Sequence, residues 1–317
     1  MKFVHVPKSF VMFVMRWFYS LSVLWCTLSG CSGGRPPPLE TTLTFPQVNS
    51  QLSIQEVRAL QTADIILIGE THDHPQHHLI QADIIRRLKP KSVAFEMLNE
   101  TQEVNGLGLK NPSTWDHVLA WSKRGWPDFE IYRPVFEATL EVGAQIIAAH
   151  PNPETLRPLK LGGELPSLLR TKMRLDQPLP PKQQAALVKE IQQAHCGHAS
   201  PVLVKAMVSA QRLKDTWMAH SILDSPKPII LIVGRGHVNM DRGIPWAMKH
   251  LQPNHEFKLK VLSLAPKSVV KSRQPIHDVI EVQVKAHRND DPCERFREQL
   301  KRLRKQSPSH HPTDVKR

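Results

Sequence analysis

Residues 64–74 of this 317-residue chain read DIILIGETHDH, a short apolar run that ends in a glycine and then in charged and imidazole side chains. A run of four to eight such residues bounded by turn signals predicts a buried strand. Similar apolar runs end in a carboxylate or an imidazole at 92–96 (SVAFE), 145–150 (QIIAAH) and 229–237 (IILIVGRGH), the last also through a glycine. The repeated pattern predicts parallel strands with polar groups at their carboxyl ends.

Amphipathic stretches alternate with these runs along the chain. We expect strands at 64–68, 92–95, 145–148, 229–233 and 260–264, with a less regular one at 279–284. We expect helices at 53–61, 76–88, 134–142, 182–194, 201–223 and 244–250. The alternation predicts one α/β domain over 51–290, a mainly parallel sheet sandwiched by helices, with a helical subdomain inserted at about 165–225.

The first thirty residues have the features of a secretory signal. They carry three basic residues and no acidic one, and an apolar run at 17–28 leads into Leu-Ser-Gly-Cys at 28–31. That ending resembles the bacterial lipobox, which implies cleavage before Cys31 and acylation of its sulfur. We therefore expect an exported lipoprotein, held at the outer membrane by its N-terminal lipid, with a tether at 31–50. An uncleaved N-terminal anchor helix is the alternative, and it also exports the rest.

The formal net charge is +13, and three of the surplus charges lie in residues 1–30, which leaves 39 basic against 29 acidic residues. Part of the remaining surplus lies at 291–317, where we expect a basic helix and tail. This segment either contacts anionic lipid headgroups or is an ordinary solvated helix. No nucleic-acid-binding motif accompanies the charge, so we expect no nucleic-acid partner.

Four cysteines are present, of which Cys26 belongs to the signal and Cys31 to the lipobox. Cys196 and Cys293 remain, and they either pair in an oxidising compartment or stay as thiols. No CxxC pair occurs, which excludes a zinc ribbon or a thioredoxin-like site.

Polar side chains at the strand ends are the candidate functional groups. Because the carboxyl ends of parallel strands meet at one edge of a sheet, we expect Glu70, His72, Glu96, His150 and His237 to converge there. Carboxylates and imidazoles together ligate first-row metal ions or act as acid–base pairs, and His72, Glu96 and His237 are the candidate ligands of a divalent metal ion. Each residue alone also has a structural explanation, such as a helix cap or an ion pair.

These residues belong to a set of motifs that resembles the ChaN family. The resemblance rests on LIGETHDH at 67–74, AFEM at 94–97, WP at 126–127, YRP at 132–134 and VGRGHV at 233–238. ChaN proteins are iron-regulated, haem-binding lipoproteins of Gram-negative bacteria, similar in their core to Tiki and TraB proteins. The resemblance implies an α/β sandwich that binds haem, a possible homodimer, and a part in haem-iron uptake with a receptor system.

Two positions depart from the family pattern as we know it. An asparagine followed by a Pro-Arg pair usually stands where this chain has His150 and its successors, and an arginine usually stands at Lys214. Haem iron takes an axial imidazole, thiolate, thioether or phenolate. Tyr132 is the one tyrosine beyond the signal and thus the one phenolate candidate, with Arg133 as a propionate partner, although Tyr132 also suits simple packing.

The imidazole candidates for haem are His72, His150 and His237.

Three hypotheses about function follow from the sequence. The first is a membrane-anchored haem-binding lipoprotein. The second is a metal-dependent hydrolase, a Tiki-like peptidase or esterase that uses Glu70, His72, Glu96 and His237. The third is a periplasmic scaffold in which the cleft has no remaining activity.

Overall fold

The computed structural model describes residues 52–100, 114–160, 163–266 and 278–287, together with 291, 293, 294, 297 and 298. All of them belong to one unit, Gln47–Arg317. The expected signal, Cys31, the tether and most of the basic C-terminal segment lie outside the described residues. None of the helices in the described ranges is long and apolar enough to cross a bilayer.

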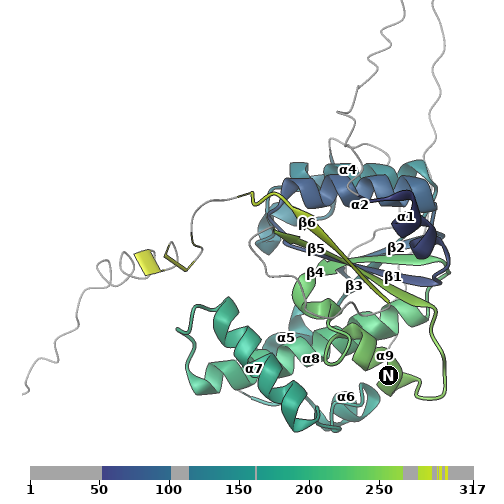
Figure 1. Cartoon of the computed structure of the whole chain (residues 1–317). Helices are drawn as coiled ribbons and strands as arrows, with labels where there is room; N and C mark the ends of the chain where they lie inside the picture. The colour runs from purple at the N-terminus through teal and green to yellow at the C-terminus, as the bar shows by residue number, and fades with distance from the viewer. Residues whose placement is uncertain are drawn as a thin grey trace, which may run out of the picture. The chain divides into compact units, whose positions relative to one another are not determined.

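A six-stranded sheet forms the centre of the fold, with strand order β3-β2-β4-β1-β5-β6 (Figure 1). Every pair of neighbouring strands is parallel. The strands are β1 (Ile65–Glu70), β2 (Ser92–Asn99), β3 (Gln145–His150), β4 (Ile229–Gly234), β5 (Leu259–Pro266) and β6 (Val279–Val284). The predicted α/β fold with a mainly parallel sheet is therefore confirmed.

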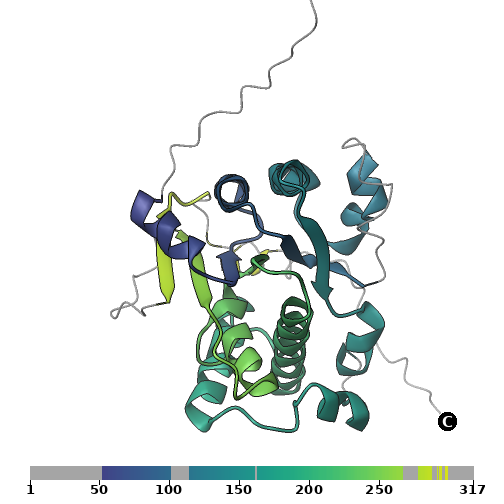
Figure 2. The ribbon, with the colours of Figure 1, turned by 90° about the vertical axis from the view of Figure 1, so that its right-hand side faces the viewer.

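Helices cover both faces of this sheet, as Figures 1 and 2 show. The described helices are α1 (Ile54–Gln61), α2 (Pro75–Leu88), α3 (Trp115–Val118), α4 (Phe129–Glu141), α5 (Pro153–Lys160), α6 (Ser167–Lys172), α7 (Pro181–Ala194), α8 (Pro201–Leu223) and α9 (Ile244–Leu251). Two 3-10 turns, η3 (Trp121–Arg124) and η4 (Arg235–Val238), complete the described elements. Helices α2 and α4 lie on one face, and α8 and α9 lie on the other (Figure 2).

The strands read as continuous apolar runs because both of their faces are buried. In β1, Ile66 and Ile68 belong to the core cluster that includes α2 and α4, whereas Ile65 and Leu67 belong to the cluster that includes α8 and α9. Successive side chains of a strand point to opposite faces. Glu70 therefore points to the same face as Ile66 and Ile68, toward α2 and α4.

The structure differs from the sequence expectation at α4, which begins at Phe129 and not at Pro134. Asp128 caps the helix, because its carboxylate accepts a hydrogen bond from the backbone N–H of Glu130 at 3.0 Å. Pro134 lies inside the helix, where it lacks one backbone donor. Burial of Phe129 and Tyr132 in the core offsets that loss.

Helices α3, α5 and α6 were not predicted. They are short, and Pro153 and Pro158 of α5 weaken the helical signal in the sequence. Packing stabilises α5 and α6, because Leu156, Leu159 and the nearby Leu165 form a small core cluster with Leu213 of α8. Tertiary contacts, not local propensity, thus determine these elements.

A disulfide joins Cys196, just after α7, to Cys293 beyond β6, with an S–S distance of 2.05 Å. Of the two alternatives for these cysteines, the structure therefore has the paired form. The bond ties the C-terminal segment to the end of α7.

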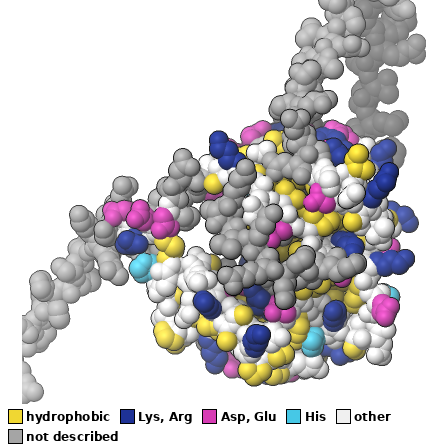
Figure 3. Space-filling model, viewed as in Figure 1, with side chains coloured by type: hydrophobic (Ala, Val, Ile, Leu, Met, Phe, Trp, Pro, Cys, Tyr) yellow, Lys and Arg dark blue, Asp and Glu magenta, His cyan; other side chains and the backbone are white. Residues whose placement is uncertain are grey.

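The net positive charge is not gathered in one place on the face that Figure 3 shows. Among the described side chains drawn there, Lys and Arg are scattered between hydrophobic and acidic side chains. This face therefore has no continuous basic patch among its described side chains.

Gly243 provides a test of the packing around η4. A Cβ atom there would lie 2.2 Å from the carbonyl oxygen of His237 and 3.0 Å from the backbone nitrogen of Asn239. Overpacking of this kind costs about 1–3 kcal/mol. We predict that Gly243→Ala lowers the thermal midpoint, followed by far-UV circular dichroism. Gly236→Ala is the matched control in the same turn, since its Cβ would meet only side-chain atoms at 3.8 Å or more. Equal midpoints for the two variants would contradict the packing.

Candidate functional site

Glu70, at the end of β1, has both carboxylate oxygens fully engaged. Its Oε1 accepts a hydrogen bond from the Tyr132 hydroxyl at 2.5 Å and lies 2.9 Å from Nδ1 of His72. Its Oε2 accepts from Nε2 of Gln81 at 2.5 Å and lies 3.1 Å from Nδ1 of His78. With all four positions used, Glu70 orients its neighbours and is not free to attack a substrate.

His78 is a buried imidazolium that neutralises Glu70. Its Nε2 donates to the backbone carbonyl of His72 at 3.0 Å, and its Nδ1 faces oxygens of both Glu70 and Gln81. Burial alone would lower the pKa of His78, but the Glu70 charge and its hydrogen bond raise it above its ordinary value. Burial would raise the pKa of Glu70, yet the charge of His78 and the hydrogen bond from His72 lower it.

His72 bridges two carboxylates and is the most accessible member of the group. Its Nδ1 contacts Glu70, while its Nε2 lies 3.5 Å from Oε2 of Glu96. The His72 side chain is 29% exposed, against 0% for Glu70 and 3% for Glu96. Burial lowers the pKa of His72, but the Glu96 charge and the Glu70 hydrogen bond outweigh burial and raise it. The ring packs edge-on against Trp126, with centroids 5.0 Å apart.

His237 lies between two further carboxylates. Its Nδ1 is 2.5 Å from Oδ1 of Asp215, a residue of α8, and its Nε2 is 3.3 Å from Oε1 of Glu96. Burial would lower the pKa of His237, but the charges of Glu96 and Asp215 raise it to about 10, so the ring is an imidazolium at neutral pH. Gln211, one turn before Asp215, also reaches the ring, at 3.0 Å from Nδ1.

Two carboxylate–histidine pairs therefore converge on Glu96: Glu70 with His72, and Asp215 with His237. Glu96 also accepts a hydrogen bond from the backbone N–H of Gly234 at 2.8 Å. A Cβ at Gly234 would lie 2.8 Å from Nε2 of His72, so only glycine allows this approach. We call this set the paired-dyad centre.

The paired-dyad centre opens into a cleft of about 720 Å³ between the sheet, η4 and α7. Such a set of fixed imidazoles and carboxylates suits general acid–base chemistry, because each carboxylate holds its histidine in one orientation. Within the described part of the chain, no group of three or more His, Cys, Asp or Glu residues is arranged to hold a metal ion. The metal-ligand prediction for His72, Glu96 and His237 thus gains no support.

A second cavity, of about 550 Å³, lies beside the first and is mainly apolar. It is lined by Lys123, Arg124, Trp126, His150, Pro153, Leu156, Leu159, Leu203, Ala206, Met207, Ala210 and Lys214. The lining includes three cations and no carboxylate. No described residue forms an ion pair with any of these cations, and Nε of Arg124 is buried without a hydrogen-bond partner. We call it the cationic–apolar cavity.

His150, at the end of β3, contributes a neutral imidazole to this cavity. Its Nδ1 donates a hydrogen bond to the carbonyl of Pro151 at 2.7 Å, which leaves the Nε2 lone pair without a proton. Burial, together with the positive charge of Lys214, lowers the pKa of His150 to about 4. The ring is therefore uncharged at neutral pH and suited to ligate a metal centre.

The predicted site residues thus separate into three places. Glu70, His72, Glu96 and His237 meet, whereas His150 lines the other cavity. Arg133 pairs with Glu130 at 2.5 Å on the α4 surface, and the fully buried Tyr132 donates to Glu70.

Sequence reasoning gave no chemical role to several residues that complete these sites: Gln81, Gln211, Asp215, Lys123 and Arg124. The spacing of four between Gln211 and Asp215 places both on one face of α8, and this was the available signal.

The His237 imidazolium predicts a pH dependence of stability. The pKa of His237 is about 10 in the folded protein and 6.5 in the unfolded chain, so its protonation stabilises the folded state. This contribution to the free energy of unfolding is complete below pH 6.5 and is lost as the pH rises toward 10. We predict that the free energy of unfolding in urea falls between pH 6.5 and 9. The fall should be at least about 1 kcal/mol smaller in His237→Gln. The exposed His255→Gln is the control, and identical slopes in wild type and His237→Gln would refute the assignment.

Comparisons with known proteins agree with this architecture. The family described as "Haem-binding uptake, Tiki superfamily, ChaN" matches residues 57–248. A solved structure of ChaN from Campylobacter jejuni, described as showing cofacial haem binding, aligns with a TM-score of 0.58 and 21% identity over 69% of this chain and 88% of that chain. At this identity the likeness concerns the fold.

The structure of the type III effector HopBA1 aligns more weakly, with a TM-score of 0.38 and 15% identity over 72% of this chain and 91% of that chain. No curated protein matches the chain. The family match covers more than half of the sequence and includes β1, β2, β3, β4 and both cavities' central residues. The chain therefore belongs to the ChaN family of haem-binding uptake proteins in the Tiki superfamily.

Proposed function

We propose that this chain binds haem in the cationic–apolar cavity, as part of haem-iron uptake. The observation that carries the proposal is the combination, in one cavity of about 550 Å³, of apolar walls, a neutral imidazole and three cations that form no ion pair with any described residue. The volume lies within the range of about 300–1,000 Å³ that is usual for ligand pockets.

Each of these features matches a part of haem. The macrocycle is apolar, and Trp126, Met207 and Leu156 provide apolar contact. The two propionates are anions, and unpaired lysine and arginine side chains bind carboxylates by charge-assisted hydrogen bonds. Haem iron takes an imidazole among its ligands, and Nε2 of His150 would be the group that holds it here. Bound in this way, haem iron is carried as cargo.

Tyr132 is the weaker ligand candidate. Its side chain is fully buried and its hydroxyl donates to Glu70, while burial and the Glu70 charge raise its pKa well above the ordinary value. A phenolate ligand to haem would require Tyr132 to leave Glu70 and lose its proton. Arg133, bound to Glu130, lines neither cavity.

We also propose export and membrane anchoring through lipidated Cys31, at the outer membrane. The lipobox-like ending at 28–31 supports this, and so does the disulfide between Cys196 and Cys293, because stable disulfides form mainly in oxidising compartments. We further propose a homodimer and exchange of haem with an uptake receptor system. Val202 and Leu203, 72% and 46% exposed, supply an apolar surface for such contacts.

A second candidate function is hydrolysis at the paired-dyad centre. Its support is that His72, fixed by Glu70, presents Nε2 beside Glu96 and is the accessible member of an otherwise buried network. In this role the neutral form of His72, with its proton on Nδ1 toward Glu70, takes a proton at Nε2 from a water molecule, and that water attacks an acyl carbon. The proton then passes to the leaving group, while His237 and Asp215 keep Glu96 ionised.

The haem proposal predicts a saturable haemin titration with one site per chain, read from the Soret band. His150→Ala should shift the Soret maximum and weaken binding at least about tenfold, because the axial ligand is lost. Lys214→Met should weaken binding without moving the band. The exposed Lys249→Met is the charge control, and Tyr132→Phe should leave the spectrum unchanged. A shifted Soret band in Tyr132→Phe alone would assign the ligand to Tyr132.

The hydrolysis proposal predicts measurable turnover of simple aryl esters by the protein. His72→Gln should reduce kcat/KM by about 100-fold or more, the usual contribution of a general base. His150→Ala, which alters the other cavity, is the control and should retain activity. Assays with and without a chelator distinguish a metal-dependent form from a metal-independent one, and equal rates for wild type and His72→Gln would rule out this function.

A further inference from the structure

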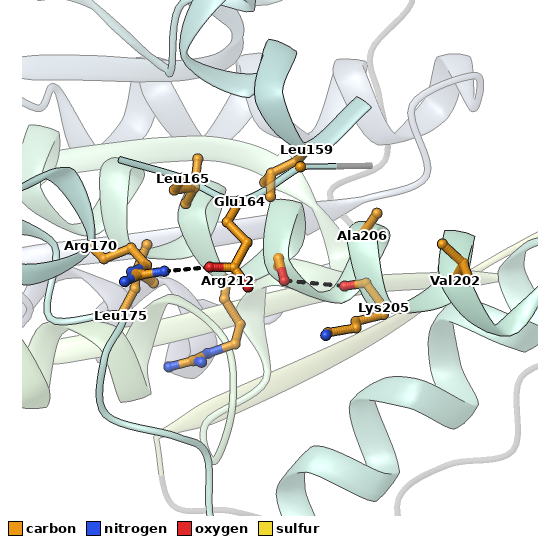
Figure 4. A pocket seen from close by; sticks show the side chains of 11 residues that line it. Leu159, Glu164, Leu165, Arg170, Leu175, Val202, Lys205, Ala206 and Arg212 are labelled. Atoms are coloured by element: carbon orange, nitrogen blue, oxygen red, sulfur yellow. Dashed lines mark hydrogen bonds and ion pairs between the residues drawn. The ribbon is translucent and has the colours of Figure 1, made fainter. Parts of the chain in front are cut away.

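A third cavity lies between α5, α6 and α8 (Figure 4). It shares no lining residue with the paired-dyad cleft, and it borders the cationic–apolar cavity through Leu159 and Ala206, which line both. Its volume is about 360 Å³, large enough for a small ligand. It is lined by Leu159, Gly163, Glu164, Leu165, Arg170, Leu175, Val202, Lys205, Ala206, Ser209 and Arg212. Of the five α8 residues, Val202, Lys205, Ser209 and Arg212 recur at intervals of three or four and Ala206 adjoins Lys205, so one face of the helix forms a wall.

The floor of this cavity is aliphatic. Leu159 and Leu165 are buried members of the small core cluster of the helical region, and Leu175 packs against that cluster. Val202, at the rim, has an exposed fraction of 72%. Together they offer a hydrocarbon surface to any molecule that enters.

Two cations in the lining are available to an anion. Arg212 donates to the carbonyl of Gln177 at 2.5 Å and lies over the Trp246 ring, but its Nε is buried without a partner. No described carboxylate forms an ion pair with Arg212, since the nearby Asp215 is bound to His237. Lys205 likewise forms no ion pair within the described part of the chain.

The third cation of the lining is already neutralised. Arg170 binds Glu164 at 2.8 Å and Asp176 at 3.3 Å, and Figure 4 shows the Glu164 pair beside Leu165 and Leu175. After this pairing, the net charge of the lining is positive because of Arg212 and Lys205. The apolar floor and the unpaired cations together fit a molecule that has a hydrocarbon body and one anionic head.

We propose that this cavity binds an aliphatic carboxylate, such as a medium-chain fatty acid, independently of the haem site. Haem itself is excluded by ligand chemistry, because the lining has no imidazole, thiolate, thioether or phenolate to hold iron. The carboxylate head contacts Arg212 and Lys205, and the alkyl chain lies on Leu159, Leu165 and Leu175. This inference does not depend on the proposed haem function.

Isothermal titration of the protein with decanoate tests the proposal. We expect one site per chain, with decanol and acetate each binding at least tenfold more weakly, since each lacks one of the two recognised features. Arg212→Met should weaken decanoate binding at least tenfold. Ser209→Leu keeps the charges and fills the cavity, and it should weaken binding to a similar extent.

The controls separate this site from the haem cavity and from misfolding. Lys249 lies elsewhere on the surface, so the Lys249→Met variant should bind decanoate with the wild-type affinity. Ser209→Leu should retain the wild-type circular dichroism spectrum and the wild-type haemin titration, because Ser209 does not line the cationic–apolar cavity. Decanol binding as tightly as decanoate, or unchanged decanoate affinity in both Arg212→Met and Ser209→Leu, would overturn the proposal.

Discussion

His72 connects two carboxylates, Glu70 and Glu96, that the sheet buries in strands β1 and β2. A buried carboxylate is stable only when positive or donor groups surround it, and removing one partner of a buried pair costs about 3–5 kcal/mol. His78, Gln81 and Tyr132 meet this need for Glu70, and His237 meets it for Glu96. Helix α2 carries two of these groups, α4 carries one and η4 carries one, so all three elements have to lie against the strand ends.

The same constraint explains the glycines at the sheet edge. Gly234 leaves room for His72 to reach Glu96, and Gly69 packs against Val238 so closely that a Cβ would lie 2.7 Å from it. Gly243 allows the backbone to pass the carbonyl of His237. The turn that carries His237 is therefore held against β1 by close backbone packing, which fixes the imidazole between Glu96 and Asp215.

The paired-dyad centre and the cationic–apolar cavity are neighbours with different chemistry. Trp126 lines the cavity and packs against His72, and Lys214 lines the cavity next to Asp215 in sequence. In the centre every charge has a partner, which suits fixed acid–base roles. In the cavity, a neutral imidazole lies beside three cations that form no ion pair with any described residue, which suits an anionic metal complex. Mutations in the paired-dyad centre and in the cationic–apolar cavity can therefore separate the proposed hydrolysis from the proposed haem binding, although the two sites are adjacent.

Much of this could be read from the sequence, because buried parallel strands leave a strong local signal. The apolar runs at 65–68 and 229–233 predicted β1 and β4 to within one or two residues at each end. Helix α5 escaped prediction because contacts with α8 stabilise it in spite of its two prolines, and α6 escaped because it is only six residues long. Asp215 also went without an assigned role, since a carboxylate inside a long helix looks solvated until the fold buries it against His237 of η4.

The sequence by itself determined which residues stand at the strand ends, because the parallel arrangement brings Glu70, Glu96, His150 and His237 to one edge. Only the tertiary structure decided how they are grouped. It directed His150 to a cavity with Lys214, placed His237 between two carboxylates, and buried Tyr132 against Glu70. The reason is physical: the face to which each side chain points depends on strand register and on the layers packed above and below, which local patterns do not encode.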